Sequence, residues 1–252
     1  MVSFKFISKE LFDLTWIDFY NTFLRENKQN LKIEVEFKEW SLKNITLDKN
    51  RKIKEGKKFL ILKKEGPSLE IYFKTPPGKS LKGIIEYLLR KSFHYGYPNS
   101  ILLHAAALNF EKRAYLFLGP SGAGKTTFVS HFPLRNIIND ERILLQKRDK
   151  KFYAKGINFW GRFRTPQIGF IEVAAIFFVF HGKSNRIIKM KKNKALALLL
   201  ANSVMPIFEE DMEVSLELIE TILNLIPTYY LYFIPRPDVK DYFLKFVTNG
   251  KK

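Results

Sequence analysis

Residues 119 to 126 of this 252-residue chain read Gly-Pro-Ser-Gly-Ala-Gly-Lys-Thr, which fits the pattern G-x-x-x-x-G-K-[ST] completely. An apolar segment, residues 115–118, precedes the motif, and a segment of helical character follows it. This is the strand–loop–helix context in which such a motif binds phosphate. The motif therefore predicts an α/β fold built around a phosphate-binding loop, and we favour this interpretation over a glycine-rich turn before an ordinary helix.

Each residue type in the motif has a physical role. Glycines let successive backbone N–H groups point at phosphate oxygens without a side chain in the way. Lys125 would reach the β- and γ-phosphates, and the Thr126 hydroxyl would take one position on Mg²⁺. The predicted ligand is a nucleoside triphosphate, ATP, with Mg²⁺ as cofactor. The predicted nucleotide-binding residues are Gly119, Pro120, Ser121, Gly122, Ala123, Gly124, Lys125, Thr126 and Thr127.

Phosphoryl transfer also needs an acid near the metal, normally at the end of an apolar strand. Asp140 follows the apolar segment 136–139 in this way, and Glu141 comes directly after it. Because Asp140 lies only fifteen residues after Lys125, the helix between them must be short and the next strand adjacent. A cap of a helix or turn is an equally good interpretation of a single aspartate.

Composition limits the other kinds of site. The chain has no Cys, which excludes disulfides, thiolate metal sites and a Cys nucleophile. Its four His show no paired spacing, so we expect no dedicated zinc site. The first residues lack the apolar core of a signal peptide, and no segment approaches the roughly 20 apolar residues of a membrane span. We therefore expect a cytoplasmic protein with no membrane span.

The formal net charge of +18 has two interpretations. A nucleic-acid-stimulated ATPase would use it to bind DNA or RNA. Lys is instead spread over the chain, with denser stretches at residues 49–58 and 183–194, each typical of a solvated turn between apolar segments. We favour a surface that is simply rich in lysine and expect no nucleic-acid partner. The positive electrostatic field of the chain still favours an anionic partner.

The chain divides at a Pro-Pro-Gly segment, residues 76–78, and we place the domains at residues 1–95 and 96–252. The first is a small α+β region, with strands expected at 32–37, 59–63 and 69–74 and a helix at 81–93. The second is strand-rich α/β. Its expected strands are 101–108, 114–118, 135–140, 142–145, 151–154, 174–180 and 228–234, and its later helices are 194–202, 215–225 and 239–247.

Three features together resemble the HPr serine kinase/phosphorylase family. They are His104 within Leu-His-Ala-Ala-Ala, about fifteen residues before the first motif glycine; a loop of the form Gly-x-Ser-Gly-x-Gly-Lys-Thr; and a close pair of acids, Asp140 and Glu141. The match is closest to the HPr-kinase-related branch found in peptide-modification clusters, which includes the lasso-peptide kinases. It covers roughly residues 101 to 247, including a Thr165-Pro166 turn and the strand at 176–178.

The resemblance implies a P-loop fold like that of the ATP-dependent phosphoenolpyruvate carboxykinases, with a mixed β-sheet. It also implies phosphoryl transfer from ATP to a hydroxyl, commonly a Ser, of a peptide or small protein, and the basic surface would help to recruit an acidic one. Asp140 would be the general base, His104 would lie close to it, and Glu141 would help to hold Mg²⁺. Lys125 would neutralise charge on the phosphoryl oxygens. The full-length relatives are hexamers, so a homo-oligomer is compatible with the resemblance.

The chain also departs from the family. Glu141 replaces an Asp, and residues 161–166 stand where the family has a glycine-rich signature, so phosphorylase activity and the HPr substrate need not carry over. Arg162 or Arg164 could bind phosphate or be surface residues. His104 could be a core residue, and His94, His131 and His181 receive no role. The functional alternatives are a regulatory or adaptor module that binds nucleotide without transfer and a small-molecule or carboxykinase-like enzyme.

Overall fold

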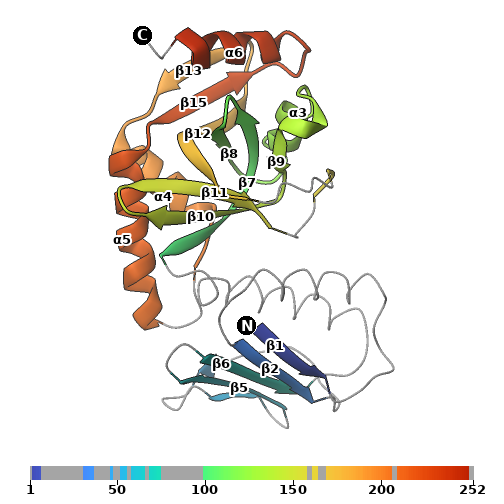
Figure 1. The fold of residues 1–252 in the computed structure, drawn as a ribbon, viewed down its shortest axis with the longest axis vertical. Helices are drawn as coiled ribbons and strands as arrows, with labels where there is room; N and C mark the ends of the chain where they lie inside the picture. The colour runs from blue at the N-terminus through green and yellow to red at the C-terminus, as the bar shows by residue number, and fades with distance from the viewer. Residues whose placement is uncertain are drawn as a thin grey trace. The chain divides into compact units, whose positions relative to one another are not determined.

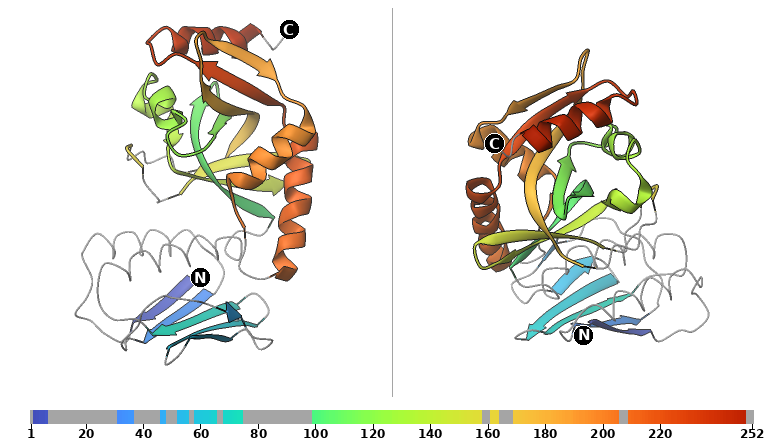
Figure 2. Two further views of the ribbon diagram at one scale, coloured as in Figure 1. Left: turned by 180° about the vertical axis from the view of Figure 1, so that it is seen from behind. Right: turned by 45° about the horizontal axis from the view of Figure 1, so that its top comes forward.

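The computed structural model describes residues 99–157, 161–163, 169–205 and 209–249, and before them the backbone of six strands. The chain separates into two compact units, Met1–Pro98 and Asn99–Lys252 (Figures 1 and 2). The boundary expected from the sequence, between residues 95 and 96, falls close to this division. None of the described helices is both long and apolar enough to cross a membrane.

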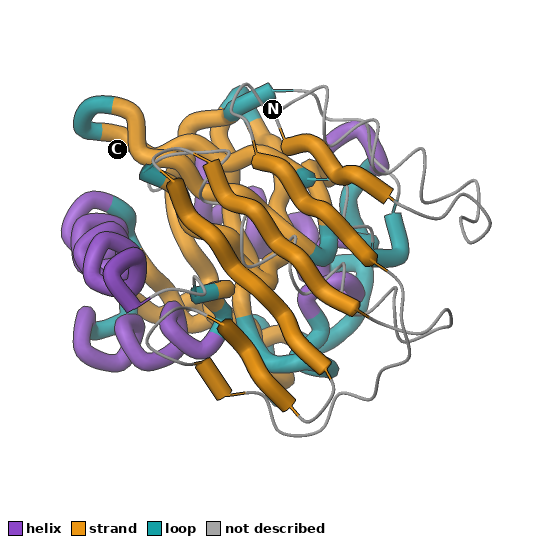
Figure 3. Tube along the Cα trace, turned by 90° about the horizontal axis from the view of Figure 1, so that it is seen from below, coloured by secondary structure: helices purple, strands orange, loops and turns teal. Residues whose placement is uncertain are grey.

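The described part of the N-terminal unit is a six-stranded sheet in the order β1-β2-β6-β5-β4-β3 (Figure 3). Strands β1 and β6 flank β2 in parallel, and the remaining pairs are antiparallel. The strands are β1 Val2–Phe6, β2 Leu31–Glu36, β3 Thr46–Leu47, β4 Lys52–Glu55, β5 Lys58–Glu65 and β6 Ser68–Lys74. The sequence predicted β2, β5 and β6.

One prediction in this unit was wrong. The lysine-rich stretch 49–58, expected to be a solvated turn, contains β4 and the start of β5, which pair as a hairpin. Lysines do not exclude a strand, because ladder hydrogen bonds come from the backbone and not from the side chains. The helix expected at 81–93 lies outside the described residues.

The C-terminal unit contains a nine-stranded mixed sheet in the order β11-β10-β7-β8-β12-β15-β13, with β9 and β14 also paired to β7. Strands β8, β12 and β15 are parallel to one another. The strands are β7 Ser100–Phe110, β8 Arg113–Leu118, β9 Ile137–Asn139, β10 Arg142–Arg148, β11 Lys151–Gly156, β12 Ile171–His181, β13 Arg186–Lys189, β14 Ser203–Val204 and β15 Thr228–Phe233. The helices are α3 Lys125–Val129, α4 Lys192–Ala201, α5 Glu209–Leu225 and α6 Val239–Asn249.

The predicted mixed α/β class is confirmed for this unit, with differences at the ends of elements. The strand expected at 135–140 is a 3₁₀ turn, Leu134–Asn136, followed by the short β9. Helix α5 begins six residues before the expected start, because residues 209–214 carry no regular apolar repeat. The second lysine-rich stretch, 183–194, was also wrongly expected to be a turn. It contains β13 and the start of α4.

Both faces of this sheet are buried. Along β12, Ile176 and Phe178 belong to one apolar core, whereas Phe177 and Val179 belong to the other, as the two-residue period of a strand requires. Helices α4 and α5 supply the first core and helices α3 and α6 supply the second. This two-sided burial explains why the strand reads as a continuous apolar run and not as an alternating one.

Phe243 of α6 is the centre of the second core. It is fully buried, and its ring centroid lies 5.4 Å from that of Phe117, 5.5 Å from that of Phe128 and 5.3 Å from that of Phe177. Aromatic rings at these separations gain attraction beyond the area they bury. One side chain therefore joins α6 to the helix that follows the phosphate-binding motif.

We predict that Phe243→Ala lowers the free energy of unfolding by about 3–5 kcal/mol, the range for removing a buried Phe side chain. Urea unfolding followed by circular dichroism would measure the change. Tyr242→Ala is the matched control, because Tyr242 is 38% exposed on the same helix and surface substitutions usually change stability by only ~0.5 kcal/mol. Equal losses in the two variants would contradict the central role of Phe243.

Candidate functional site

The predicted phosphate-binding loop connects β8 to α3, at the edge of the sheet where the parallel strands β8, β12 and β15 end. Ligands bind outside the carboxyl ends of parallel strands in open α/β sheets. Gly122 and Gly124 have φ values of +78° and +95°, which favour glycine. A Cβ on Gly124 would also lie only 2.9 Å from the Phe233 ring. The loop therefore requires glycine at position 124 for two separate reasons.

Lys125, the first residue of α3, is buried with 6% of its surface exposed. Its Nζ donates hydrogen bonds to the carbonyl oxygens of Gly119 (2.7 Å) and Pro120 (3.1 Å). Burial lowers the pKa of Lys125, while the charge of Glu141 raises it and that of Arg142 lowers it. The ammonium therefore lies within the loop, and of the two predicted acids Glu141 is the one whose charge acts on its pKa.

The turn that carries the acids is fixed by Asn139, which is fully buried at the end of β9. Its Oδ1 accepts the backbone N–H groups of Glu141 (2.7 Å) and Arg142 (2.9 Å), and its Nδ2 donates to the carbonyl of Ile157 (2.8 Å). An asparagine that bonds its own backbone two and three residues later sets the turn. The orientation of Asp140 and Glu141 is thus set by the residue before them.

Asp140 is only 2% exposed. Its Oδ2 accepts the backbone N–H of Arg162 (2.8 Å) and its Oδ1 that of Phe163 (3.2 Å). Gly161 lies so close that a Cβ there would be 2.7 Å from Asp140 Oδ2. The main chain of Arg162 therefore bonds Asp140. The Arg162 guanidinium lies 5.6 Å from the centre of the Phe163 ring. Arg164 and the expected Thr165-Pro166 turn lie outside the described residues.

His104 and Glu141 form a pair, with Nε2 and Oε2 3.6 Å apart and each side chain 31% exposed. Glu141 Oε1 also lies 3.1 Å from Nη1 of Arg142, which is opposite His104 in the β7–β10 ladder. His104 is therefore half-buried beside an acid. The pair lies next to the point where Ala105 of β7 pairs with Leu118, the residue directly before the loop.

Two residues beside the loop were missed by the sequence analysis. Asn202, the C-cap residue of α4, accepts the Gly119 N–H on its Oδ1 at 3.2 Å. His181, the last residue of β12, has Nε2 3.0 Å from the carbonyl oxygen of Gly122. His181 stands at the end of a long apolar run in the sequence. This position was a usable signal, because the loop lies at the edge of the sheet where such strands end. No local pattern marks Asn202.

Among the residues that the structure describes, no three His, Asp or Glu side chains are grouped closely enough to hold a metal ion by themselves. Mg²⁺ in nucleotide sites is commonly held by one or two protein oxygens together with phosphate oxygens and water. Thr126 is half-buried at the start of α3, and Glu141 offers a half-buried carboxylate. These donors fit a metal bound mainly through the nucleotide.

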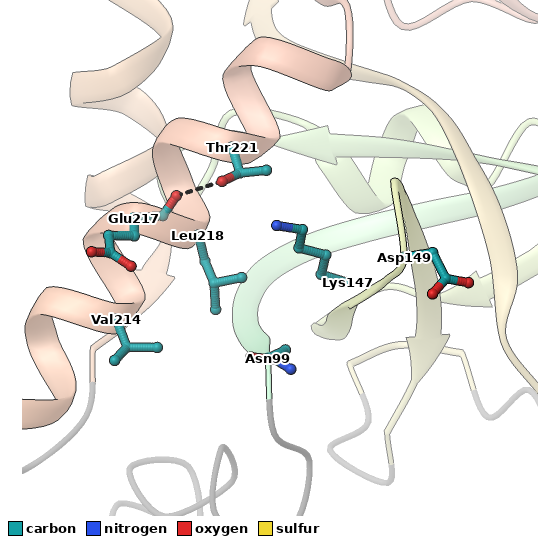
Figure 4. Close-up of a pocket in the computed structure, with 7 residues that line it drawn as sticks. All are labelled: Asn99, Lys147, Asp149, Val214, Glu217, Leu218 and Thr221. Atoms are coloured by element: carbon teal, nitrogen blue, oxygen red, sulfur yellow. Dashed lines mark hydrogen bonds between the residues drawn. The ribbon is translucent and has the colours of Figure 1, made fainter.

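A separate groove of about 240 Å³ lies between β10 and α5 (Figure 4). It contains none of the predicted site residues. Its lining residues are Asn99, Lys147, Asp149, Val214, Glu217, Leu218 and Thr221. In the close-up, the Thr221 hydroxyl donates to the Glu217 carbonyl within α5, a bond of 2.8 Å.

No family model matches the sequence, and no curated protein matches it. Among solved structures, the chain is similar to the Hpr(Ser) kinase/phosphatase from Coxiella burnetii, with 12% sequence identity and a TM-score of 0.36. The match covers 60% of this chain and 97% of that one. The likeness is distant.

We predict that Lys125→Met weakens Mg-ATP binding at least tenfold, because hydrogen bonds to charged groups contribute about 1.5–3 kcal/mol. Isothermal titration calorimetry would give the dissociation constant. Lys150→Met is the matched control, since Lys150 is exposed in the turn between β10 and β11 and carries the same charge. An unchanged ATP affinity in Lys125→Met would show that this loop does not hold the phosphates.

Proposed function

We propose that this chain is an HPr-kinase-like enzyme that transfers the γ-phosphoryl group of Mg-ATP to a hydroxyl, a Ser of a peptide or small protein. The observation that carries the proposal is the register of β7, in which Ala105 pairs with Leu118, directly before the loop, and Ala107 pairs with Asn139, directly before the acids. It supports one site in which a phosphate-binding lysine and the acidic turn act on the same ligand.

In this proposal the N–H groups of the loop that follow Gly119 hold the phosphates, and Lys125 balances the charge that builds up on the phosphoryl oxygens. Thr126 and Glu141 would hold Mg²⁺, which when bound neutralises phosphate charge. The acceptor oxygen forms a bond to the γ-phosphorus as the bond to the β-phosphate oxygen breaks, and ADP leaves. The hydroxyl proton passes to the Asp140 carboxylate, a step that makes a weak nucleophile reactive.

Asp140 can act as a base only if part of its carboxylate is available. Each carboxylate oxygen has about two lone-pair sites, so the N–H groups of Arg162 and Phe163 occupy one site on each oxygen. Because the side chain is 2% exposed, an acceptor hydroxyl would have to displace the covering segment, 161–163, or enter beside it. The two N–H groups would meanwhile hold the base in one orientation.

We propose an acidic acceptor, because a chain with a net charge of +18 attracts anionic partners over a distance. A Ser within an acidic peptide or small acidic protein would benefit from this steering, and its binding would weaken with salt. We also propose that the protein works in the cytoplasm.

One observation favours a second candidate, a regulatory module that binds nucleotide without transferring phosphate. Asp140 is buried and both of its oxygens accept backbone N–H groups, as a purely structural carboxylate would. In that case its role would be to hold the segment 161–163, and ATP would act as a ligand and not as a substrate.

We predict that Asp140→Asn lowers phosphoryl transfer at least 100-fold, within the 10²–10⁴ range of general-base catalysis, while ATP affinity changes less than threefold. The assay combines γ-labelled ATP, Mg²⁺ and acidic Ser-containing peptides. Asp149→Asn is the matched control, because Asp149 is exposed and lies in a turn at φ +52°, a conformation that Asn also tolerates. Its transfer rate should equal that of the wild type.

The two candidates differ in the outcome of this assay. A labelled acceptor that disappears only with Asp140→Asn supports the kinase. Calorimetric binding of ATP by the wild type, with no labelled acceptor in either wild type or Asp140→Asn, supports the regulatory module. Failure of the wild-type chain to bind ATP would contradict both.

A further inference from the structure

Asn202 is a buried polar residue, 6% exposed, whose side chain forms two hydrogen bonds in different directions. Its Oδ1 accepts the backbone N–H of Gly119 at 3.2 Å, across 83 positions of sequence. Its Nδ2 donates to the carbonyl of Leu198 at 2.8 Å, within α4. The side chain therefore joins the end of α4 to the first residue of the phosphate-binding loop.

The main chain of Asn202 reaches another part of the site. Its carbonyl accepts the backbone N–H of His104 at 2.8 Å. Directly afterwards β14 joins the sheet, with Ser203 opposite Leu103. One residue thus contacts the loop through its side chain and the His104 strand through its backbone.

These contacts determine how the loop begins. Gly119 is buried, its carbonyl accepts the Lys125 ammonium at 2.7 Å, and its N–H is directed to Asn202. The Gly119 N–H is therefore not a phosphate donor in this arrangement, and phosphate would be held by the N–H groups that follow. Asn202 also bonds the backbone of His104, whose side chain lies 3.6 Å from Glu141. The bond between Gly119 and Asn202 therefore also sets the position of the loop relative to the acidic turn.

We infer that Asn202 is a positioning residue that holds the phosphate-binding loop in register with the His104–Glu141 pair. The catalytic part of this inference rests on the proposed function. A simple cap of α4 would account for the bond to Leu198, but not for the bond to Gly119. The amide suits both tasks, because it presents an acceptor and a donor on one short side chain.

Two further substitutions separate the bonds. Asn202→Ala removes the bonds to both Gly119 and Leu198, whereas Asn202→Asp keeps an acceptor for the Gly119 N–H. Ser203→Ala is the matched control, because the Ser203 hydroxyl donates to the Leu199 carbonyl at 2.7 Å at the same helix end and does not contact the loop. Neither Asn202 nor Ser203 is placed among the residues that bind nucleotide.

The first test is amide hydrogen exchange in the chain without nucleotide. We expect the peptide that contains Gly119 to exchange at least tenfold faster in Asn202→Ala than in wild type or Ser203→Ala, with partial restoration in Asn202→Asp. The second test is Mg-ATP titration, in which Asn202→Ala should bind at least fivefold more weakly than Ser203→Ala at equal thermal stability.

The results distinguish this inference from the proposed function. Equal exchange at Gly119 in Asn202→Ala and Ser203→Ala would overturn the inference, whether or not ATP binds. Faster exchange with unchanged ATP affinity would overturn the positioning role and leave Asn202 as a structural link. If wild type binds no ATP, the proposed function fails, and the exchange experiment still decides whether Asn202 holds the loop.

Discussion

The candidate site depends on the backbone hydrogen bonds of one strand, β7, which changes partners midway along its length. Within residues 103–107, β7 pairs with Ser203 of β14, Arg142 of β10, Leu118 of β8 and Asn139 of β9. Each of these residues lies next to a segment that carries part of the site. Because buried backbone groups must be paired, the ladder brings together four parts of the chain that are distant in sequence. The positions 105–107 are all fully buried Ala, which leaves room for neighbours on both faces.

This dependence explains what the sequence could and could not predict. The loop and the short path from Lys125 to Asp140 are local features, and the chain between them must turn back within fifteen residues. The contacts of Asp140 with Arg162 and of Gly119 with Asn202 span 22 and 83 positions, and in each the donor is a backbone N–H, which every residue type except proline possesses. No residue pattern marks them. The lysines around β13 led to the prediction of a turn where the structure has a strand, because strand pairing uses backbone groups and does not depend on the side chains.

The electrostatics of the loop follow from the same arrangement. Burying the Lys125 ammonium removes it from water, and the carbonyls of Gly119 and Pro120 partly replace the lost hydration. Glu141 favours the charged form, whereas Arg142 opposes it. A triphosphate would bring anionic oxygens to a cation that has two carbonyl partners and one acid within reach. These two carbonyls hold the Lys125 ammonium within the loop, and this placement limits the rearrangement that phosphate binding requires.

The two candidate functions, kinase and regulatory module, differ in the role of Asp140, which is a general base in the first and a structural carboxylate in the second. The residues around Asp140 help to decide between these roles. A structural carboxylate would explain the N–H bonds from Arg162 and Phe163. It would not explain why the next residue, Glu141, keeps a carboxylate 31% exposed between His104 and Arg142. A turn needed only for folding has no requirement for a half-buried acid, a histidine and an arginine near the loop lysine. Charged side chains grouped in this way mark a candidate functional site, and on this ground we propose transfer in preference to binding alone.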